Sequence, residues 1–406
     1  MLRFAPTSSE DMNVCDLRIA LFNYIIAKQM GEEFIVRIED TNNDSDSKNQ
    51  EILDLLSLFG IEYSQVVYQS QNLRFHSAMA LQLVHEKKAF SCFCSDEWLD
   101  KKKAQAKEAN QPYRYDDACR NLPPELVIDN TNPFSIRIKK PDRDTSLDSL
   151  VIMDRDKKPT WDFASAVDDM LSDISFVVRD EKYITNTQKQ IHIRNSLEYN
   201  KDIKYTHIPT ILKAQEFSIK RLLEDGFLPE AISNYLISTQ SKSPYEVFNI
   251  VDAVKDFKLE DISNSPAHFS LDALKEINKK HLQNLDAVEL SRYVGFADAE
   301  IGEVAKIYLD DIYTTKDLKK KIEAIFTPKQ IPQEFKDDAK KFVDALKDAP
   351  YFENYDDFKK YIIENSTIQT KNFSEIFSYL LTGSKTTPNI EKVYGYLKNY
   401  IGEIIK

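Results

Sequence analysis

The first forty residues carry two short apolar runs, separated by a longer apolar stretch with helical spacing. The runs lie near residues 1–5 and 34–38, and Leu21–Tyr24 lies inside the helical stretch. This pattern predicts a strand, a tight loop, a helix and a second strand. The order is that of the opening of a nucleotide-binding α/β fold, in which the ligand lies at the carboxyl ends of the strands.

Further helices are predicted after these strands, and the carboxyl-terminal part is helical throughout. Residues 47–59 have apolar side chains at helical spacing and end at Gly60, which suits a helix carboxyl-terminal cap. Residues 73–87 repeat the pattern. From about Pro244 to Lys406, apolar residues recur at i, i+3 and i+4 between Pro, Asp or Asn breaks. We attribute these apolar faces to core packing.

Composition indicates an ordinary globular protein. The chain has 406 residues, of which 42% are hydrophobic and 30% are charged, which suits roughly two to four domains with a core each. No apolar run approaches the roughly 18 residues of a membrane span, and no signal peptide is recognisable. We therefore expect a cytoplasmic protein without a membrane partner.

Charge and glycine content narrow the classes of ligand. The net charge of −12 argues against a protein that wraps nucleic acid through bulk charge. Local basic strips can still bind RNA, although a run such as Lys101–Lys103 more often forms a solvated helix face. Only eight glycines occur, well below the usual share of about 7%. Because loops that cradle phosphate groups need glycine, few such loops can exist here.

Four stretches together resemble one known family. They are Arg3-Phe-Ala-Pro6, Val167-Asp-Asp169, Asn186-Thr187 and Gly226-Phe-Leu-Pro-Glu-Ala231. The same motifs occur in this order in bacterial glutamyl-tRNA synthetases, and the chain resembles that family over nearly its whole length. The resemblance implies an α/β Rossmann-type class I synthetase catalytic domain with an inserted acceptor-binding subdomain, followed by an all-α anticodon-binding domain.

The resemblance also divides the chain into five segments. They are the first half of the Rossmann catalytic domain (1–88), the inserted acceptor-stem-binding subdomain (89–148), the second Rossmann half (149–205), a stem-contact helical connector (206–243) and a helical anticodon-binding domain (244–406). The second Rossmann half is expected to begin near Ser149.

The first ATP signature of that family is altered. In place of a His-Ile-Gly-Asn type of sequence, the chain has Asn13, Val14, Cys15 and Asp16. Asn13 cannot carry positive charge, and Cys15 adds a side chain where relatives have glycine. Glu10 and Asp16 bring carboxylates toward the expected triphosphate, which they would repel.

The second ATP signature is missing. After Leu212 the chain reaches Gly226 without the family's Lys-Met-Ser-Lys loop, and Ser218-Ile-Lys220-Arg221 fits the start of the following helix better. Because both signatures are affected, we do not expect ATP and magnesium to bind in the family's way.

The family's contacts to glutamate, in contrast, carry over. The resemblance assigns them to Arg3, Thr7, Glu39, Trp161, Ser165 and Arg179. It implies that Arg3 pairs with the side-chain carboxylate of glutamate, Glu39 with its ammonium group, and that Arg179 supports carboxylate recognition. Trp161 replaces a tyrosine, and Ser165 replaces a residue that is often asparagine. The alternative is that Arg3, Glu39 and Arg179 form a buried ion-pair network at the sheet edges.

Three of the four cysteines fall in the expected insertion together with a tyrosine. Cys92, Cys94 and Cys119 supply three thiolates, and the Tyr115-x3-Cys119 spacing suggests a phenolate or a water as a fourth ligand. A structural zinc ion takes four ligands in a closed tetrahedral site. The order of these residues resembles the zinc site of the truncated glutamyl-queuosine relatives. Buried reduced cysteines are the alternative.

The sequence therefore predicts a glutamyl-tRNA synthetase-like pseudoenzyme that has lost ATP-dependent glutamate activation. It would bind tRNA or another protein of tRNA metabolism, because the scaffold is kept while both signatures are affected. The alternative is a divergent active glutamate–tRNA ligase, or an enzyme that acts on glutamyl-tRNA without ATP. A structural partner of another tRNA enzyme, without RNA contact, is the third hypothesis.

Overall fold

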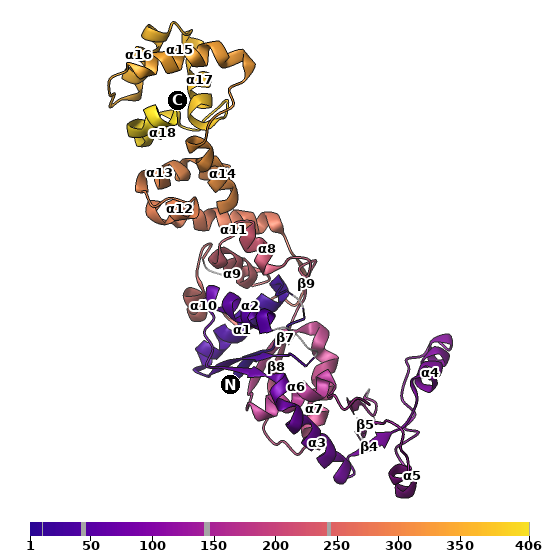
Figure 1. The fold of residues 1–406 in the computed structure, drawn as a ribbon. Helices are drawn as coiled ribbons and strands as arrows, with labels where there is room; N and C mark the ends of the chain where they lie inside the picture. The colour runs from indigo at the N-terminus through magenta and orange to yellow at the C-terminus, as the bar shows by residue number, and fades with distance from the viewer. Residues whose placement is uncertain (10, 42–45, 142–146, 242–244, 406) are drawn as a thin grey trace. The chain divides into compact units, whose positions relative to one another are not determined.

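The computed structural model describes residues 1–9, 11–41, 46–141, 147–241 and 245–405 (Figure 1). Glu10, one of the two carboxylates expected near the triphosphate, lies outside these residues. The chain divides into two compact units, which we describe separately. The amino-terminal unit comprises Met1–Glu216, Thr239–Lys242 and Ile250–His268, and the carboxyl-terminal unit comprises the remainder.

A five-stranded parallel sheet is the main element of the amino-terminal unit. Its order is β3-β2-β1-β7-β8, and all neighbouring strands are parallel. The strands are β1 (Leu2–Phe4), β2 (Phe34–Ile38), β3 (Gln65–Tyr68), β7 (Phe176–Asp180) and β8 (Lys204–Ile208). β1 and β2 are buried along their whole length, as expected of parallel strands covered on both faces. The strand order reverses between β1 and β7, the point at which such sheets bind ligands.

Helix α1 (Val14–Met30) follows the first strand and contacts β1, β2 and β7. Asn13 caps its amino terminus, because the Asn13 side chain accepts hydrogen bonds from the amides of Cys15 and Asp16. Asp16 accepts from the amide of Asn13 in return. This capping box satisfies amides that the helix itself leaves free. The helix ends at Gly31, whose φ of 65° suits glycine.

Four further helices accompany the sheet. They are α2 (Asp46–Leu58), α3 (Leu73–His85), α6 (Trp161–Leu171) and α7 (Ile184–Ser196). α3 contacts α6, and α6 contacts α7. The helices predicted at 47–59 and 73–87 are confirmed to within two residues, and Gly60 has a positive φ of 69°.

A second, antiparallel sheet belongs to the predicted insertion. Its order is β4-β5-β6, with β4 (Ala89–Cys92), β5 (Ser135–Ile138) and β6 (Val151–Met153). Between β4 and β5 the chain forms α4 (Asp96–Glu108) and α5 (Pro124–Ile128). We expected the second Rossmann half to begin near Ser149, but β6 pairs with β5 and not with the parallel sheet.

Three short elements complete the amino-terminal unit. β9 (Ile211–Leu212) pairs in parallel with β10 (Ala267–His268), and α10 (Ile250–Asp256) contacts α1. Phe257, which follows α10, stacks on Phe22 of α1 with ring centroids 4.9 Å apart. Residues 250–268 therefore pack with the amino-terminal unit, although the apolar spacing grouped them with the carboxyl-terminal helices.

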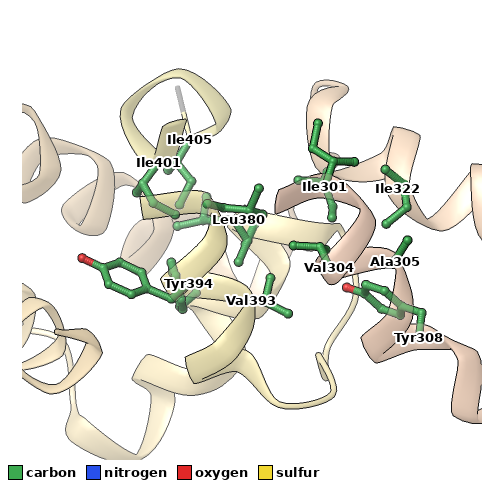
Figure 2. Packing of buried hydrophobic residues seen from close by; sticks show 14 of the residues in the cluster. Ile301, Val304, Ala305, Tyr308, Ile322, Leu380, Val393, Tyr394, Ile401 and Ile405 are labelled. Carbon is green, nitrogen blue, oxygen red and sulfur yellow. The ribbon is translucent and has the colours of Figure 1, made fainter. Parts of the chain in front are cut away.

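The carboxyl-terminal unit is helical, as the apolar spacing predicts. Its helices are α8 (Ile219–Glu224), α9 (Pro229–Ser238), α11 (Leu271–Asn284), α12 (Ala287–Tyr293), α13 (Ala299–Ile307), α14 (Thr315–Phe326), α15 (Lys336–Lys347), α16 (Tyr355–Ser366), α17 (Thr370–Thr382), α18 (Ile390–Leu397) and α19 (Ile401–Ile404). One apolar cluster spans most of them, and Figure 2 shows Val304 of α13 and Val393 of α18 within it. Among all described residues, no helix has the length and apolar character needed to cross a bilayer.

Candidate active site and metal centre

A cavity of about 390 Å³ opens where β1, β2 and β7 end. Its lining includes five of the six residues assigned to glutamate contact, namely Arg3, Thr7, Glu39, Trp161 and Arg179. Asp16 of α1 also lines it, as do Asp180 and Tyr183 at the end of β7. The cavity therefore lies at the reversal of strand order, where parallel sheets bind ligands.

A buried ion-pair network stands behind this cavity. Asp169 of α6 accepts from Arg3 Nε at 2.7 Å and from Arg37 Nη1 at 2.5 Å. Arg37 also donates to Glu39 at 3.2 Å. Burial alone would raise the pKa of Asp169, but the guanidinium groups of Arg3 and Arg37 hold it well below its usual range. Removing one partner would leave a buried charge without compensation.

The carboxylate of Glu39 is held by three donors. Besides Arg37, the indole Nε1 of Trp161 donates at 2.6 Å and Ser165 Oγ donates at 3.3 Å. The backbone of Glu39 forms an isolated parallel bridge with Thr7. The carboxylate is thereby fixed at the cavity wall, where it can accept hydrogen bonds from an ammonium group.

Arg179 on β7 is buried and forms no ion pair with a carboxylate among the described residues. Its Nη1 atom donates to Gln190 at 2.9 Å and to Thr187 at 3.3 Å. Its guanidinium lies 4.9 Å from the centroid of the Tyr183 ring. Burial, and then the charge of Arg3, lower the pKa of Arg179 to about 10. A buried cation without a counter-ion favours the binding of an anion in the cavity.

Each of the two explanations for Arg3, Glu39 and Arg179 accounts for part of this geometry. Arg3 and Glu39 belong to an ion-pair network, but they are joined through Asp169 and Arg37, which were not among the predicted site residues. Arg179 lies outside the network and lines the cavity. Ser165 contacts Glu39 without lining the cavity. The assignment of the six residues to glutamate contact stays a prediction.

The sequence holds a signal that would have identified Arg37 and Asp169. Arg37 is the one charged residue in the apolar strand β2, and Asp168 and Asp169 are buried in α6. A charge in a buried segment needs a partner, because an isolated buried charge is costly. Asp168 follows the same rule, since it accepts from Gln69 at 2.7 Å and lies 2.8 Å from His76 Nε2.

The four altered signature positions form the start of α1. The Asn13 oxygen already bonds the amides of Cys15 and Asp16, which leaves less of the helix amino terminus for a phosphate group. Asp16 lines the cavity, whereas Asn13, Val14 and Cys15, all within the described part of the chain, do not. The Cys15 thiol lies 3.9 Å from the Ile211 carbonyl oxygen. Burial, followed by the charge of Asp16, raises the pKa of Cys15 to about 11, so it is a neutral packing group.

The connection after β9 is short. Residues 213–218 separate β9 from α8 in the chain. Ser218 caps α8 by accepting from the amide of Arg221. Ser218-Ile219-Lys220 is therefore a helix start, as its spacing to Gly226 predicts, and not a phosphate-binding loop.

Cys92, Cys94 and Cys119 come together. Their sulfur atoms lie within 4.8 Å of one another, and the Tyr115 hydroxyl lies 3.3 Å from Cys92 Sγ and 3.5 Å from Cys94 Sγ. Ligand atoms about 2.3 Å from one zinc ion would be roughly 3.8 Å apart in a tetrahedron, so this donor set fits zinc.

The charge state of the cluster depends on its surroundings. Burial disfavours the Cys92 thiolate, but hydrogen bonds from Tyr115, from the Cys94 backbone and from Arg137 lower the pKa of Cys92 to about 7. Burial raises the pKa of Cys94 to about 12, and burial raises the pKa of Tyr115 as well. Because zinc binds thiolates, its binding would displace protons from this cluster. Without metal, Cys94 would stay a thiol, whereas the lowered pKa of Cys92 favours its thiolate.

Known proteins match the chain from end to end. Residues 1–276 match the model of a family described as tRNA synthetases class I (E and Q), catalytic domain. A glutamate–tRNA ligase 2 from Sulfurimonas denitrificans is 53% identical, and a glutamate–tRNA ligase 1 from Nitratiruptor is 41% identical, each over 100% of both chains. The alignment with the first spans 432 positions while the chain has 406 residues, so that relative contains residues that this chain lacks.

Two solved structures share the fold. The structure of a glutamate tRNA ligase from Elizabethkingia meningosepticum in complex with its amino acid matches with a TM-score of 0.80 at 20% identity, covering 100% of this chain and 98% of that one. A glutamate-tRNA synthetase from Elizabethkingia anophelis matches with a TM-score of 0.79 at 19% identity and the same coverage. The expected architecture, a Rossmann-type domain with a helical carboxyl-terminal part, is thereby confirmed.

Proposed function

The chain belongs to the class I tRNA synthetase (E and Q) family, and from that premise we propose that it binds tRNA and recognises glutamate in the cavity at the ends of β1, β2 and β7. The charge pattern of the cavity carries this proposal. Arg179, which forms no ion pair with a carboxylate of the described residues, Arg3 and Glu39 all line this cavity, and they bring two guanidinium groups and a carboxylate. Glutamate offers two carboxylates and one ammonium group, which complement these charges.

Transfer of glutamate to tRNA is the first candidate reaction. It is favoured because relatives that match the whole chain carry the name glutamate–tRNA ligase. In such a reaction the α-carboxylate of glutamate displaces pyrophosphate from ATP, and a ribose hydroxyl of tRNA then displaces AMP. Glu39 would hold the ammonium group, while Arg3 and Arg179 would hold the side-chain carboxylate and leave the α-carboxylate to react. ATP and magnesium would then be required ligands.

Binding of glutamate or glutamyl-tRNA without ATP-dependent activation is the second candidate, and the start of α1 favours it. The capping box occupies amides at the helix amino terminus, and Asp16 adds a carboxylate to the cavity. Only residues 213–218 lie between β9 and α8, and they do not contain the family's Lys-Met-Ser-Lys sequence. One lost electrostatic contact typically costs about 10²–10³ in catalytic rate, so a ligase with this site would be slow.

Glutamylation of total tRNA by the purified full chain separates the two candidates. ATP-dependent charging that disappears in a Glu39→Gln variant, purified in the same way, supports the ligase and excludes a contaminating enzyme. Absent charging, combined with thermal stabilisation by glutamate and a tRNA gel shift, supports the second candidate. A ligand at 100 times its dissociation constant adds about 2.7 kcal/mol, which a melting experiment detects. A chain that binds neither glutamate nor tRNA would overturn the whole proposal.

We also propose that Cys92, Cys94, Tyr115 and Cys119 hold a structural zinc ion. The convergence of the three sulfur atoms and the Tyr115 hydroxyl supports this assignment. A closed four-ligand site contributes folding energy and no chemistry. Elemental analysis of the full chain, purified without chelator, tests it: about one zinc per chain is expected, and the alternative of reduced cysteines predicts none.

A further inference from the structure

Arg137 on β5 makes three contacts with the thiolate cluster and its surroundings. Its Nε atom donates to Cys92 Sγ at 3.3 Å, and its Nη1 atom donates to the Ser149 carbonyl oxygen at 2.8 Å. Its guanidinium carbon lies 3.8 Å from the centroid of the Tyr115 ring. The side chain is buried, with 8% of its surface exposed. Arg137 thus contacts two of the four candidate ligands.

The charge of Arg137 is not balanced by a carboxylate of the residues that the structure describes. Among the described residues, no carboxylate forms an ion pair with it, and its hydrogen bonds go to a sulfur atom and a carbonyl oxygen. A buried cation is costly unless an anion lies beside it. The sulfur of Cys92 is the one hydrogen-bond partner that can supply that anion, by binding as a thiolate.

Arg155 provides the contrast. It also reaches the cluster segment, where it donates to the Cys94 carbonyl oxygen. Its charge is matched, however, because it pairs with Asp96 at 2.5 Å, and the Asp96 side chain is largely exposed. Arg155 therefore needs no thiolate.

We propose that Arg137 is a positioning residue of a metal centre made by Cys92, Cys94, Tyr115 and Cys119, in which it offsets the excess negative charge of the ligands and orients two of them. This inference rests on the zinc assignment above. Three thiolates already outweigh the two positive charges of a zinc ion, and a phenolate adds a further negative charge. The guanidinium supplies the missing cation within hydrogen-bond distance of Cys92 and faces the Tyr115 ring.

The geometry explains how Arg137 can both offset the negative charge of the ligands and orient two of them. The hydrogen bond from Nε takes up one side of the Cys92 sulfur and leaves its other electron pairs for a metal. The contact with the Tyr115 ring holds the hydroxyl of that ring near Cys92 and Cys94. The bond to the Ser149 carbonyl fixes the guanidinium itself.

Metal affinity of full-length variants tests the proposal. Zinc dissociation constants are measured by chelator competition for the wild type, Arg137→Met, Arg137→Lys and the matched control Arg155→Met. Partners of metal ligands typically contribute about 10- to 100-fold in affinity, so Arg137→Met is expected to bind zinc about 10- to 100-fold more weakly. Arg137→Lys, which keeps the charge, should fall between, and Arg155→Met should match the wild type. Cobalt(II) loading gives a second readout, because loss of the bond to Cys92 should shift the thiolate-to-cobalt absorption band.

Melting curves separate this role from a packing role. The proposal predicts that Arg137→Met lowers the melting temperature of the metal-loaded protein and leaves the metal-free protein nearly unchanged. Equal losses in both forms would show that Arg137 only packs, and would overturn the proposal. Wild-type zinc affinity and cobalt spectrum in Arg137→Met would overturn it while leaving the zinc site intact. A wild-type chain that binds neither zinc nor cobalt would overturn the zinc assignment. All of these measurements are independent of glutamate and tRNA binding.

Discussion

The two sides of the cavity in the amino-terminal unit differ in where their polar groups are bonded. On the side that we propose for amino-acid binding, called the amino-acid side, Arg37 and Asp169 hold Glu39 and Arg3, and Arg179 forms no ion pair with a carboxylate of the described residues. On the side that we propose for phosphate binding, called the phosphate side, Asp16 is the one residue of the altered signature, all of it described, that lines the cavity. Its carboxylate and the side-chain oxygen of the neighbouring Asn13 accept hydrogen bonds from backbone amides in the capping box at the start of α1. The first side is prepared for a ligand, while the second has satisfied much of its own hydrogen-bonding capacity.

This difference shows what a bound ligand requires of a protein surface. A group that recognises a charged ligand must be held rigidly and still have capacity left toward the cavity. Arg179 meets both conditions, because Gln190 and Thr187 hold it and no carboxylate neutralises it among the described residues. Asn13 meets only the first, since its acceptor oxygen is used by the helix.

The largest expected effect comes from removing the support of the amino-acid side. Asp169→Asn leaves Arg3 and Arg37 without their shared counter-charge, and breaking a buried pair costs about 3–5 kcal/mol. Both tryptophans, Trp98 and Trp161, lie in the amino-terminal unit, so tryptophan fluorescence during urea unfolding reports on that unit. The control, Asp173→Asn, removes an exposed carboxylate that pairs with Lys201 and should leave the transition nearly unchanged. Equal midpoints for both variants would contradict the network.

The next effect is on glutamate affinity. Arg179→Met removes the unbalanced cation, and a hydrogen bond to a charged group is worth about 1.5–3 kcal/mol, which is about 10- to 100-fold in affinity. Titration calorimetry with glutamate measures it. Arg194→Met is the matched control, because Arg194 is also buried but donates to the Tyr205 hydroxyl and does not line the cavity. If both variants bound glutamate like the wild type, the cavity would not be the glutamate site.

Acid should weaken the amino-acid side through Asp169. Its pKa in the folded chain is depressed, so its stabilising contribution is present above the unfolded pKa of about 3.9 and is lost as pH falls toward the folded value. The contribution of this carboxyl should fall by up to about 1.4 kcal/mol per pH unit in that window. Urea midpoints of tryptophan fluorescence below about pH 4 should drop less steeply for Asp169→Asn. An equally steep fall of the urea midpoint in the wild type and in Asp169→Asn would show that other carboxylates determine the acid sensitivity of stability.

The smallest expected effect is on the phosphate side. Asp16→Asn removes a carboxylate from the cavity and keeps an acceptor for the capping box, and one like charge about 4 Å away is worth about 1 kcal/mol in water. ATP with magnesium should then bind roughly fivefold more tightly, as measured by thermal stabilisation. Asp11→Asn, an exposed carboxylate of the same segment that does not line the cavity, should bind ATP like the wild type. Unchanged binding in Asp16→Asn would show that the Asp16 carboxylate does not limit ATP binding.

The sequence by itself determined the local elements and the candidate ligands. The strands and the helix within residues 1–41 follow from apolar spacing, and Gly60 was recognisable as a helix end because a left-handed φ suits glycine. The order of Cys92, Cys94, Tyr115 and Cys119, through its resemblance to a known zinc site, was enough to name them as candidate ligands, with buried reduced cysteines as the alternative. The departures at Asn13 to Asp16 were visible in the same way.

Only the tertiary structure decided which distant polar and charged groups pair with one another. Arg3 and Asp169 lie 166 residues apart in sequence, and Trp161 and Glu39 lie 122 apart, yet each pair forms a hydrogen bond. Likewise, β6 pairs with β5 of the insertion sheet, and Arg137 of β5 donates a hydrogen bond to Cys92 of β4. A buried charge must find a counter-charge, but the sequence does not state which one, because that depends on which strands become neighbours.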